Sequence, residues 1–171
     1  MVTEYRYKQI YSTTKCFYEK LERIHRERPI EEQWETYRDT YMDNAVAFFI
    51  FCYHIKDWIK NDPAIDKTIK SAVESYIDRN NCLKSCADIA NGTKHLSLTK
   101  QRSLSRPRVT SEEMVMHADG SKKKPGSDEY ADVTVETNAY VLTDEGQKEI
   151  FELASECLRA WDAFFKQNKI G

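Results

Sequence analysis

The stretch Ala45–Ile55, AVAFFIFCYHI, decides the fold because it is the most apolar run of the chain. A helix that spans a membrane needs about 20 apolar residues. Eleven residues that include a histidine therefore predict a helix buried on most sides inside a protein. Around this run, apolar residues recur at spacings of three and four in one main stripe: Trp34, Tyr37, Tyr41, Ala45, Phe48, Cys52, Ile55 and Ile59. A second stripe lies beside it: Ala47, Phe51, His54 and Trp58.

Two apolar stripes on one helix require neighbours on two sides, so residues 30–61 are predicted to form the central helix of a bundle. The same spacing predicts a helix over 3–27, which ends before Pro29. Pro63 suits the first turn of a following helix over 64–78.

The next predicted helix begins near Asn81, and its end has two interpretations. Asn91-Gly92 is a turn signal, so the helix can stop there through a glycine in the left-handed region. It can also continue to Leu98 at a glycine cost of about 1 kcal/mol. A final helix is predicted over 144–168, with Thr143 as its N-cap.

Between these helices the pattern changes from helical to alternating. Apolar and polar residues alternate in VTVETNAYV, 133–141, which predicts a strand, and RVTSEEMVMH, 108–117, is a candidate partner. The segment between them holds two glycines, a proline and three lysines, and is predicted to be a long hairpin tip. The fold class is therefore mainly α: an up-and-down bundle of about five helices with a β-hairpin inserted before the last helix, in a single domain over 1–171.

Composition restricts the function classes. The chain has 171 residues, 40% apolar and 32% charged, with a net charge of −2. This is a soluble globular composition, and no global field attracts nucleic acid or a membrane. The start, MVTEYRYKQIY, is polar and aromatic, so we expect no secretory signal.

The chain has five cysteines, an odd number, and none forms a C-x2-C pair. Four of the five fall at apolar positions of helical patterns, which predicts buried, reduced thiols in a cytoplasmic protein. No pair of candidate ligands has zinc-finger or H-E-x-x-H spacing, so we expect neither a metal nor a cofactor.

Polar residues cluster in CADIANGTKHLS, 86–97. If the helix continues past Gly92, Lys84, Asp88, Asn91 and His95 share one stripe. On the central helix, His54 and Asp57 are spaced i, i+3 beside Trp58. An acid, an amide, an imidazole and an ammonium between two helices can perform acid–base chemistry. The candidate catalytic residues are His54, Asp57, Asp88, Asn91, Lys94 and His95.

Each of these residues also has a structural interpretation. A histidine on an apolar helix face is usually a hydrogen-bonded core residue. Asp88 can pair with Lys84, and Asn91-Gly92 can be a simple turn. The stretch 89–110 contains no acid. Its candidate nucleic-acid-binding residues are Lys100, Arg102, Arg106 and Arg108, which suit a phosphate backbone or a solvated loop equally well.

The segments FCYHIKDWI, CADIANGTKH and ECLRAWDAFF together resemble uncharacterised bacterial helical proteins, which are in turn similar to the HEPN superfamily of helical bundles. The resemblance covers 30–98 and 143–167. It implies a superfamily with many ribonucleases of toxin–antitoxin and defence systems, often dimeric. Nuclease members carry an Arg, a polar residue and a His four to six residues after the Arg. Here RNNCLKSC supplies Arg79 and Asn80, but the next His is His95.

This departure leaves two interpretations of the resemblance. Either DIANGTKH replaces the usual constellation, or the chain is a non-catalytic member. The first predicts metal-independent RNA cleavage, in which His54 or His95 is the base or acid, Asp57 or Asp88 orients an imidazole, and Lys94 stabilises phosphate charge. The alternative is a binding or oligomerisation module for a protein or nucleotide partner. The expected partners are RNA or a nucleotide and a second copy of the chain, with no membrane.

Overall fold

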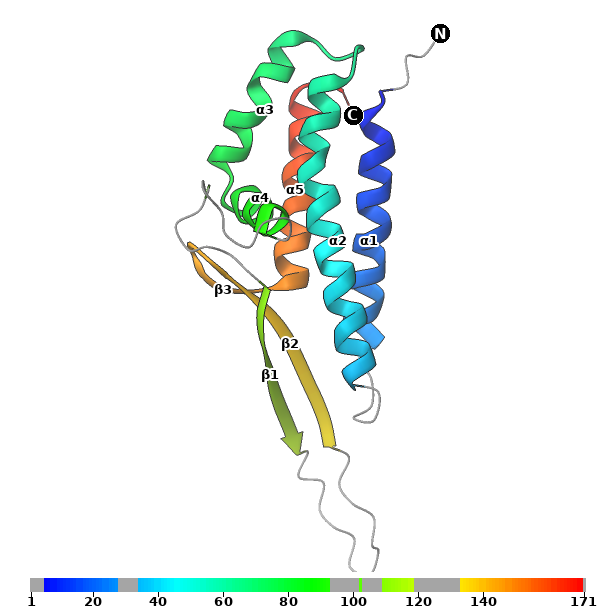
Figure 1. Cartoon of the computed structure of the whole chain (residues 1–171), viewed down its shortest axis with the longest axis vertical. Coiled ribbons are helices and arrows are strands. Elements are labelled where there is room, and N and C mark those ends of the chain that lie inside the picture. The colour runs from blue at the N-terminus through cyan, green and yellow to red at the C-terminus, as the bar shows by residue number, and fades with distance from the viewer. Residues whose placement is uncertain (1–4, 28–33, 93–101, 103–108, 119–132, 171) are drawn as a thin grey trace, which may run out of the picture.

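The structure is a computed structural model of the chain, and it describes residues 5–27, 34–92, 102, 109–118 and 133–170 (Figure 1). For 34–38, 109–118, 133–138 and 142 it describes the backbone alone. The elements, in chain order, are α1 (Tyr7–Glu27), α2 (Trp34–Asn61), α3 (Lys67–Arg79), α4 (Asn81–Gly92), β1 (Val109–Ala118), β2 (Val133–Thr143), β3 (Gly146–Glu149) and α5 (Ile150–Gln167). The predicted class, a mainly α bundle with a hairpin before the last helix, is confirmed.

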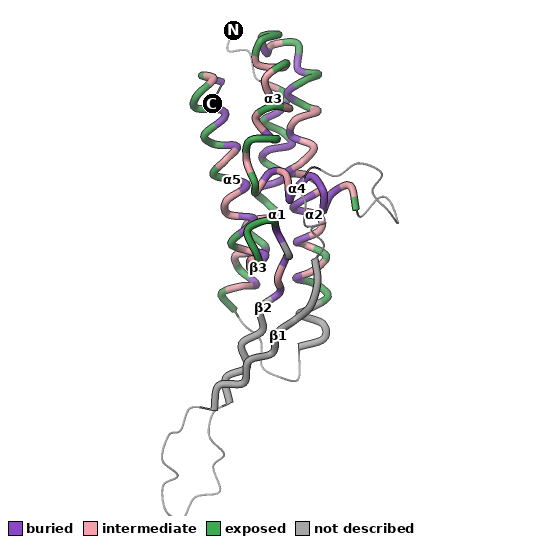
Figure 2. The backbone as a smooth tube through the Cα atoms, turned by 90° about the vertical axis from the view of Figure 1, so that its left-hand side faces the viewer, coloured by how far each residue is buried: buried purple, intermediate pink, exposed green. Residues whose placement is uncertain are grey.

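α2 is the central helix, as the apolar run predicted, since it packs against α1, α3, α4 and α5. α1, α2 and α5 run side by side as long rods, whereas α4 lies across them (Figures 1 and 2). The main stripe of α2 is fully buried at Ala45, Phe48, Cys52, Ile55 and Ile59. Burial of a large apolar side chain contributes about 1.5–3 kcal/mol, so this stripe supplies much of the core energy.

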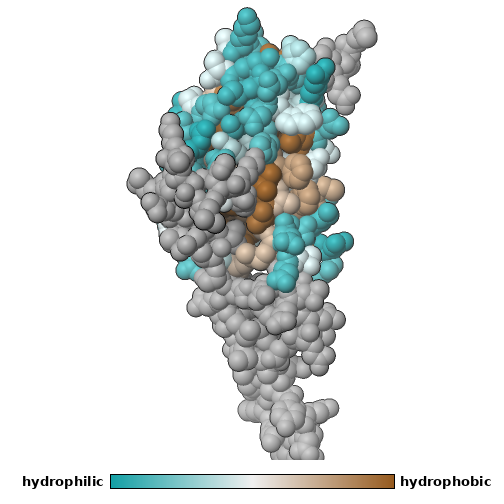
Figure 3. Space-filling view, in the orientation of Figure 1, coloured by the Kyte–Doolittle hydropathy of each residue, from teal (hydrophilic) through white to brown (hydrophobic). Residues whose placement is uncertain are grey.

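The second stripe of α2 was expected to be covered by a second neighbouring helix, but it is only partly buried. Phe51 and His54 are half-buried, and Trp58 is 36% exposed. Phe17 of α1 stacks on Phe51 with ring centroids 5.2 Å apart, which covers part of the stripe. Figure 3 shows the consequence, an apolar surface over the middle of α1 and α2 between hydrophilic regions.

The turn between α2 and α3 is organised by Asp62, which is 1% exposed. One carboxylate oxygen accepts hydrogen bonds from the backbone N–H groups of Arg6 and Tyr7 at 2.5 and 3.3 Å. The other accepts from the N–H of Ala64 at 2.9 Å. Asp62 thereby satisfies donors at the start of α1, which helix geometry leaves unpaired, and ties them to the end of α2.

The helix boundaries differ from the predictions at several starts. α3 begins at Lys67 and not at Ala64, because Asp66 is its N-cap and accepts from the N–H of Thr68 at 2.7 Å. The predicted break near 79–81 is confirmed, since Asn80 has an extended backbone between α3 and α4. The continuation of α4 past Gly92 lies outside the described residues.

The prediction that Thr143 caps the last helix is wrong. β1, β2 and β3 form an antiparallel sheet in that order, with Thr143 opposite Gly146. The Thr143 hydroxyl donates to the Gly146 carbonyl at 2.8 Å, and Gly146 has a φ of 111°, which favours glycine. The chain therefore turns back into β3, and Glu149 caps α5 by accepting from the N–H of Glu152 at 2.9 Å.

The predicted hairpin is confirmed at the backbone level. β1 pairs with β2 along its length, for example Met114 with Thr137, with an irregularity between Thr110 and Glu112. The hairpin points away from the end of the bundle where the N- and C-termini lie (Figure 1). At that other end, the Tyr7 hydroxyl donates to the Ile170 carbonyl at 2.5 Å, which fixes the C-terminal residues against α1.

Candidate functional site

The predicted pair on α2 forms. Nδ1 of His54 lies 2.9 Å from a carboxylate oxygen of Asp57, one turn further along the helix. The side chains are 31% and 43% exposed, so both the imidazole and the carboxylate reach solvent. A carboxylate on Nδ1 fixes the orientation and the tautomer of an imidazole. This geometry suits an acid–base pair.

Asp88 has a different environment from the one expected. It is fully buried on α4, and both of its carboxylate oxygens accept from the backbone N–H of Arg102, at 2.9 and 3.1 Å. These contacts anchor Arg102 to α4. The proposed role of Asp88 in orienting an imidazole therefore has no support from its contacts with Arg102.

The Arg102 side chain extends from this anchor to α3. Its guanidinium donates to Glu74 and to Asp78, each at 2.5 Å. Its Cζ atom lies 6.0 Å from the ring centroid of Tyr53 on α2. Arg102 thus joins α2, α3 and α4, and the sequence had identified it only as a candidate phosphate-binding residue.

Glu74 is the centre of the network. Besides Arg102, it accepts from Lys60 at 2.9 Å and from Lys56 at 3.3 Å, both on α2. Burial acts to raise the pKa of Glu74, but the hydrogen bonds from Lys60 and Arg102 and the charge of Lys56 outweigh it and lower the pKa to about 2. Lys56 also lies 3.3 Å from Asp57, which connects this network to His54.

We call this set the ionic network of α2 and α3: Tyr53, His54, Lys56, Asp57, Lys60, Glu74, Asp78, Asp88 and Arg102. Within it, Lys56, Lys60 and Arg102 each contact at least one carboxylate. The pKa of Lys56 is raised, because Tyr53, Asp57 and Glu74 outweigh the effect of burial. A phosphate group would have to compete with these carboxylates for the three cations.

The structure brings together some of the predicted site residues and leaves others undescribed. Asp57, Asp88 and Arg102 belong to one network, and Asn91 is half-buried in the last turn of α4. Lys94, His95, Lys100, Arg106 and Arg108 lie outside the described residues. The role of His54 or His95 as the base or acid therefore stays a prediction.

The two residues that carry the resemblance to nuclease members make local contacts. The Nε atom of Arg79 donates to the Ser75 carbonyl at 3.1 Å. Asn80 caps α3 and donates through its side chain to the Tyr76 carbonyl at 2.6 Å. Both contacts stabilise the end of α3.

Sequence reasoning missed the residues that link the network, Lys56, Lys60, Glu74 and Asp78. A signal for them was present in the spacing. Two lysines four apart on one predicted helix and two acids four apart on the next are complementary once the helices pack side by side.

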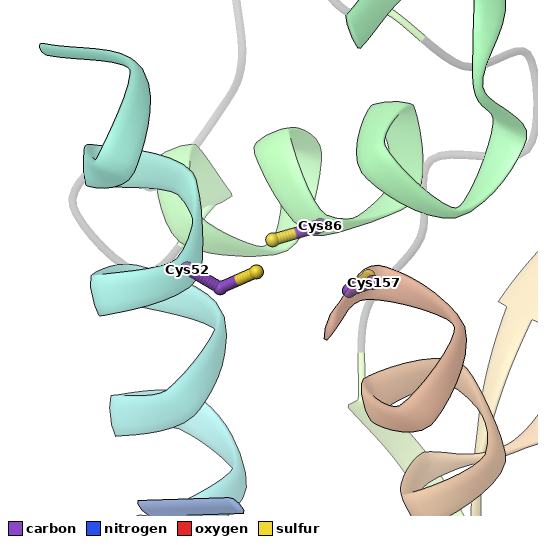
Figure 4. A group of neighbouring side chains, drawn as sticks. All are labelled: Cys52, Cys86 and Cys157. Carbon is purple, nitrogen blue, oxygen red and sulfur yellow. The ribbon is translucent and has the colours of Figure 1, made fainter. Parts of the chain in front are cut away.

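The proximity of three cysteine sulfurs was also not predicted from the sequence. Cys52, Cys86 and Cys157 come from α2, α4 and α5, and their Sγ atoms all lie within 4.8 Å of one another (Figure 4). The prediction of buried free thiols is confirmed for these three, while Cys82 is half-buried and Cys16 is exposed. Among the described residues, this is the group that could hold a metal ion.

No protein-family model, curated protein or solved structure matches this chain. The resemblance to HEPN bundles thus stays a prediction from three short segments. Within the described part of the chain, no helix is both long enough and apolar enough to cross a membrane.

A further surface feature lies between α1 and α5. This groove has a volume of about 490 Å³, and its lining includes Tyr7, Tyr11, Lys15 and Asp162. The Tyr11 hydroxyl donates to Asp162, and burial together with this contact raises the pKa of Tyr11 above its usual range. The hydrogen bond links α1 and α5 beside the groove.

Proposed function

We propose that the chain cleaves RNA without a metal ion, with His54 and Asp57 as its acid–base pair. The observation that supports this proposal is the 2.9 Å contact between two partly exposed side chains, one an imidazole and the other a carboxylate. A general base must be within reach of both solvent and substrate, and a histidine is the side chain best suited to proton transfer near neutral pH.

In the proposed reaction, His54 takes the proton of a ribose 2′-hydroxyl. The 2′-oxygen forms a bond to phosphorus as the bond from phosphorus to the 5′-oxygen breaks, and a second acid protonates the leaving oxygen. His95 is the sequence candidate for this acid and lies outside the described residues. Asp57 stabilises the imidazolium that forms on His54.

The charges developing on the phosphate need cations, and Lys56 and Lys60 are the nearest described candidates on α2. Both contact Glu74. RNA binding at this face therefore includes a competition between phosphate and the Glu74 carboxylate, and removal of the Glu74 charge should strengthen RNA binding at low salt.

The test compares His54→Ala and Asp57→Asn with His25→Ala in cleavage of a fluorescently labelled single-stranded RNA. His25 is a matched control, since it is a partly exposed histidine 3.8 Å from a carboxylate, that of Glu149. We expect His54→Ala to lose at least about 100-fold in rate and His25→Ala to change by less than about 2-fold. Unchanged cleavage by His54→Ala, or no cleavage by the wild type, would rule out the assignment.

A second candidate function is supported by a specific observation. His54 belongs to the half-exposed stripe of α2 with Phe51 and Trp58, and apolar surface covers the middle of this helix (Figure 3). Contiguous exposed apolar surface is typical of protein interfaces. In this alternative, the chain is a non-catalytic module that pairs with a second copy through α2.

Sedimentation velocity tests the second function. A dimer through α2 predicts that Trp58→Asp shifts the wild-type dimer to monomer. A wild type that is monomeric at 100 μM, about a hundredfold above a micromolar dissociation constant, would exclude stable pairing.

A further inference from the structure

The three buried thiols form the strongest unassigned cluster of the molecule. Cys52, Cys86 and Cys157 are each 0–1% exposed and belong to one hydrophobic core cluster. Figure 4 shows the Cys52 and Cys86 sulfurs directed toward one another from α2 and α4, with Cys157 beside them on α5. Three separate helices must keep their packing for these sulfurs to remain together.

The distances allow a shared ligand. Three sulfurs bound to one ion at about 2.3 Å, the length of a zinc–thiolate bond, lie roughly 3.4–4.0 Å apart. The three sulfurs here lie within 4.8 Å of one another. To share one ion, the sulfurs therefore need to approach one another by no more than roughly 1.4 Å.

A second observation concerns the indole of Trp161. Its Nε1 atom is buried and has no hydrogen-bond partner among the described residues. An unpaired buried donor is costly, by roughly the strength of a lost hydrogen bond. Trp161 also acts to lower the pKa of Cys52, so a more negatively charged sulfur at Cys52 would give this unpaired N–H group an acceptor.

Charge and ligand number then select the ion. Three thiolates with a divalent ion leave a net charge of −1 in an apolar core, and with a trivalent ion they leave none. Burial of net charge is strongly unfavourable. Structural zinc almost always takes four ligands; Cys82 adjoins Cys157 but is not part of the group of three sulfurs within 4.8 Å of one another.

We propose that Cys52, Cys86 and Cys157 form a three-thiolate site for a trivalent thiophilic ion of the arsenite class. In this reaction, As(OH)3 forms three As–S bonds and loses three As–O bonds. Each thiol proton leaves with a hydroxyl group as water, so three waters are released. No electron is transferred, and the bound product is neutral. The site is independent of the RNA-cleaving function proposed above.

The test incubates the reduced full-length protein with arsenite for several hours and then removes unbound ion by gel filtration. We expect one arsenic per chain. X-ray absorption at the arsenic edge should give three sulfur neighbours. Two sulfurs and one oxygen would mean capture by a simple dithiol, and less than about 0.2 equivalents would mean that the thiols only fill the core; either result overturns the proposal.

The variants are Cys52→Ala, Cys157→Ser and the matched control Cys16→Ser, whose thiol is exposed on α1. Loss of a site thiol should weaken arsenite binding at least 10-fold, and the control should bind within about 2-fold of the wild type. Circular dichroism identifies any variant that fails to fold. The number of sulfur neighbours of arsenic in the wild type tests the proposal even if a variant does not fold. Equal binding by all three variants would overturn the proposal.

A parallel binding experiment with zinc in place of arsenite tests the choice of ion. Zinc retained at one equivalent by the wild type, and lost in Cys82→Ser, would assign the sulfurs to a tetrahedral four-thiolate site instead. In our proposal, Cys82→Ser binds arsenite within about 3-fold of the wild type, because Cys82 is not one of the three ligands.

Discussion

Replacement of Glu74 by glutamine should weaken the fold and remove part of its sensitivity to acid. The Glu74 carboxylate accepts hydrogen bonds from Lys56, Lys60 and Arg102. These contacts hold α2 against α3 and fix the position of Arg102. The glutamine side chain has the same shape but no charge. It keeps an oxygen acceptor and loses the attraction to three cations.

The magnitude follows from the pKa of Glu74, which falls from 4.5 to about 2. At about 1.36 kcal/mol per pKa unit, the shift corresponds to an upper limit of ~3.4 kcal/mol. The Glu74 side chain is 33% exposed, so solvent screening reduces this figure, and we expect a loss of about 1 kcal/mol in the free energy of unfolding. For a chain of this size, this lowers the melting temperature by roughly 2–4 °C.

The sign of the pH dependence follows from the same shift. A carboxyl group whose pKa is lower in the folded state than in the unfolded state stabilises the fold. The contribution is complete at pH values above the pKa of the unfolded state, and it is lost as the pH falls through the pKa of the folded state. The difference in stability between wild type and Glu74→Gln should therefore be largest above pH 5. It should decrease between pH 4.5 and pH 2.

Urea unfolding, followed by circular dichroism at several pH values, measures this difference. The control is Glu22→Gln, which breaks the exposed pair of Glu22 with Arg26 at 2.6 Å on α1. An exposed i, i+4 pair contributes only about 0.3–0.5 kcal/mol. Equal losses in the two variants, or a wild-type advantage over Glu74→Gln that does not change with pH, would refute the reasoning.

Three further substitutions test the packing and the caps by urea unfolding. Asp62→Ala removes the acceptor for the first N–H groups of α1 and should cost about 1–2 kcal/mol; a loss below 0.5 would contradict the capping role. Asp88→Ala leaves the partly buried N–H of Arg102 without this acceptor and should cost about 1–3 kcal/mol, so an unchanged midpoint would show that the contact is replaceable. Phe48→Ala empties a fully buried position of α2 and should cost about 3–5 kcal/mol; a smaller loss than for Asp62→Ala would argue against α2 as the core helix.

Much of the candidate site could be predicted where it depends on a single helix. His54 and Asp57 are three residues apart, and helix geometry alone places residues at this spacing on one face. Their 2.9 Å contact was therefore available from the sequence. The contacts of Asp88 were not, because its partner Arg102 is 14 residues away along the chain and on a different segment.

The start of the last helix shows a second limit of local reasoning. Thr143 followed by two acids is a typical helix N-terminus, but the same residues also suit a tight turn. Pairing with β2 decides between them, since the backbone of Gly146–Glu149 gains strand partners that a helix would forgo. A single sequence gives no measure of that pairing energy.

The sequence by itself determined the bundle, its central helix and the hairpin, because the repeat of apolar residues at three and four, or at two, needs no knowledge of other segments. Only the tertiary structure decided which side chains from different helices meet. It placed Lys56, Glu74 and Arg102 in one ionic network and the sulfurs of Cys52, Cys86 and Cys157 in one cluster. The physical reason is that spacing along a helix fixes the direction of a side chain, whereas the packing angle and the depth of each helix fix which side chains it faces.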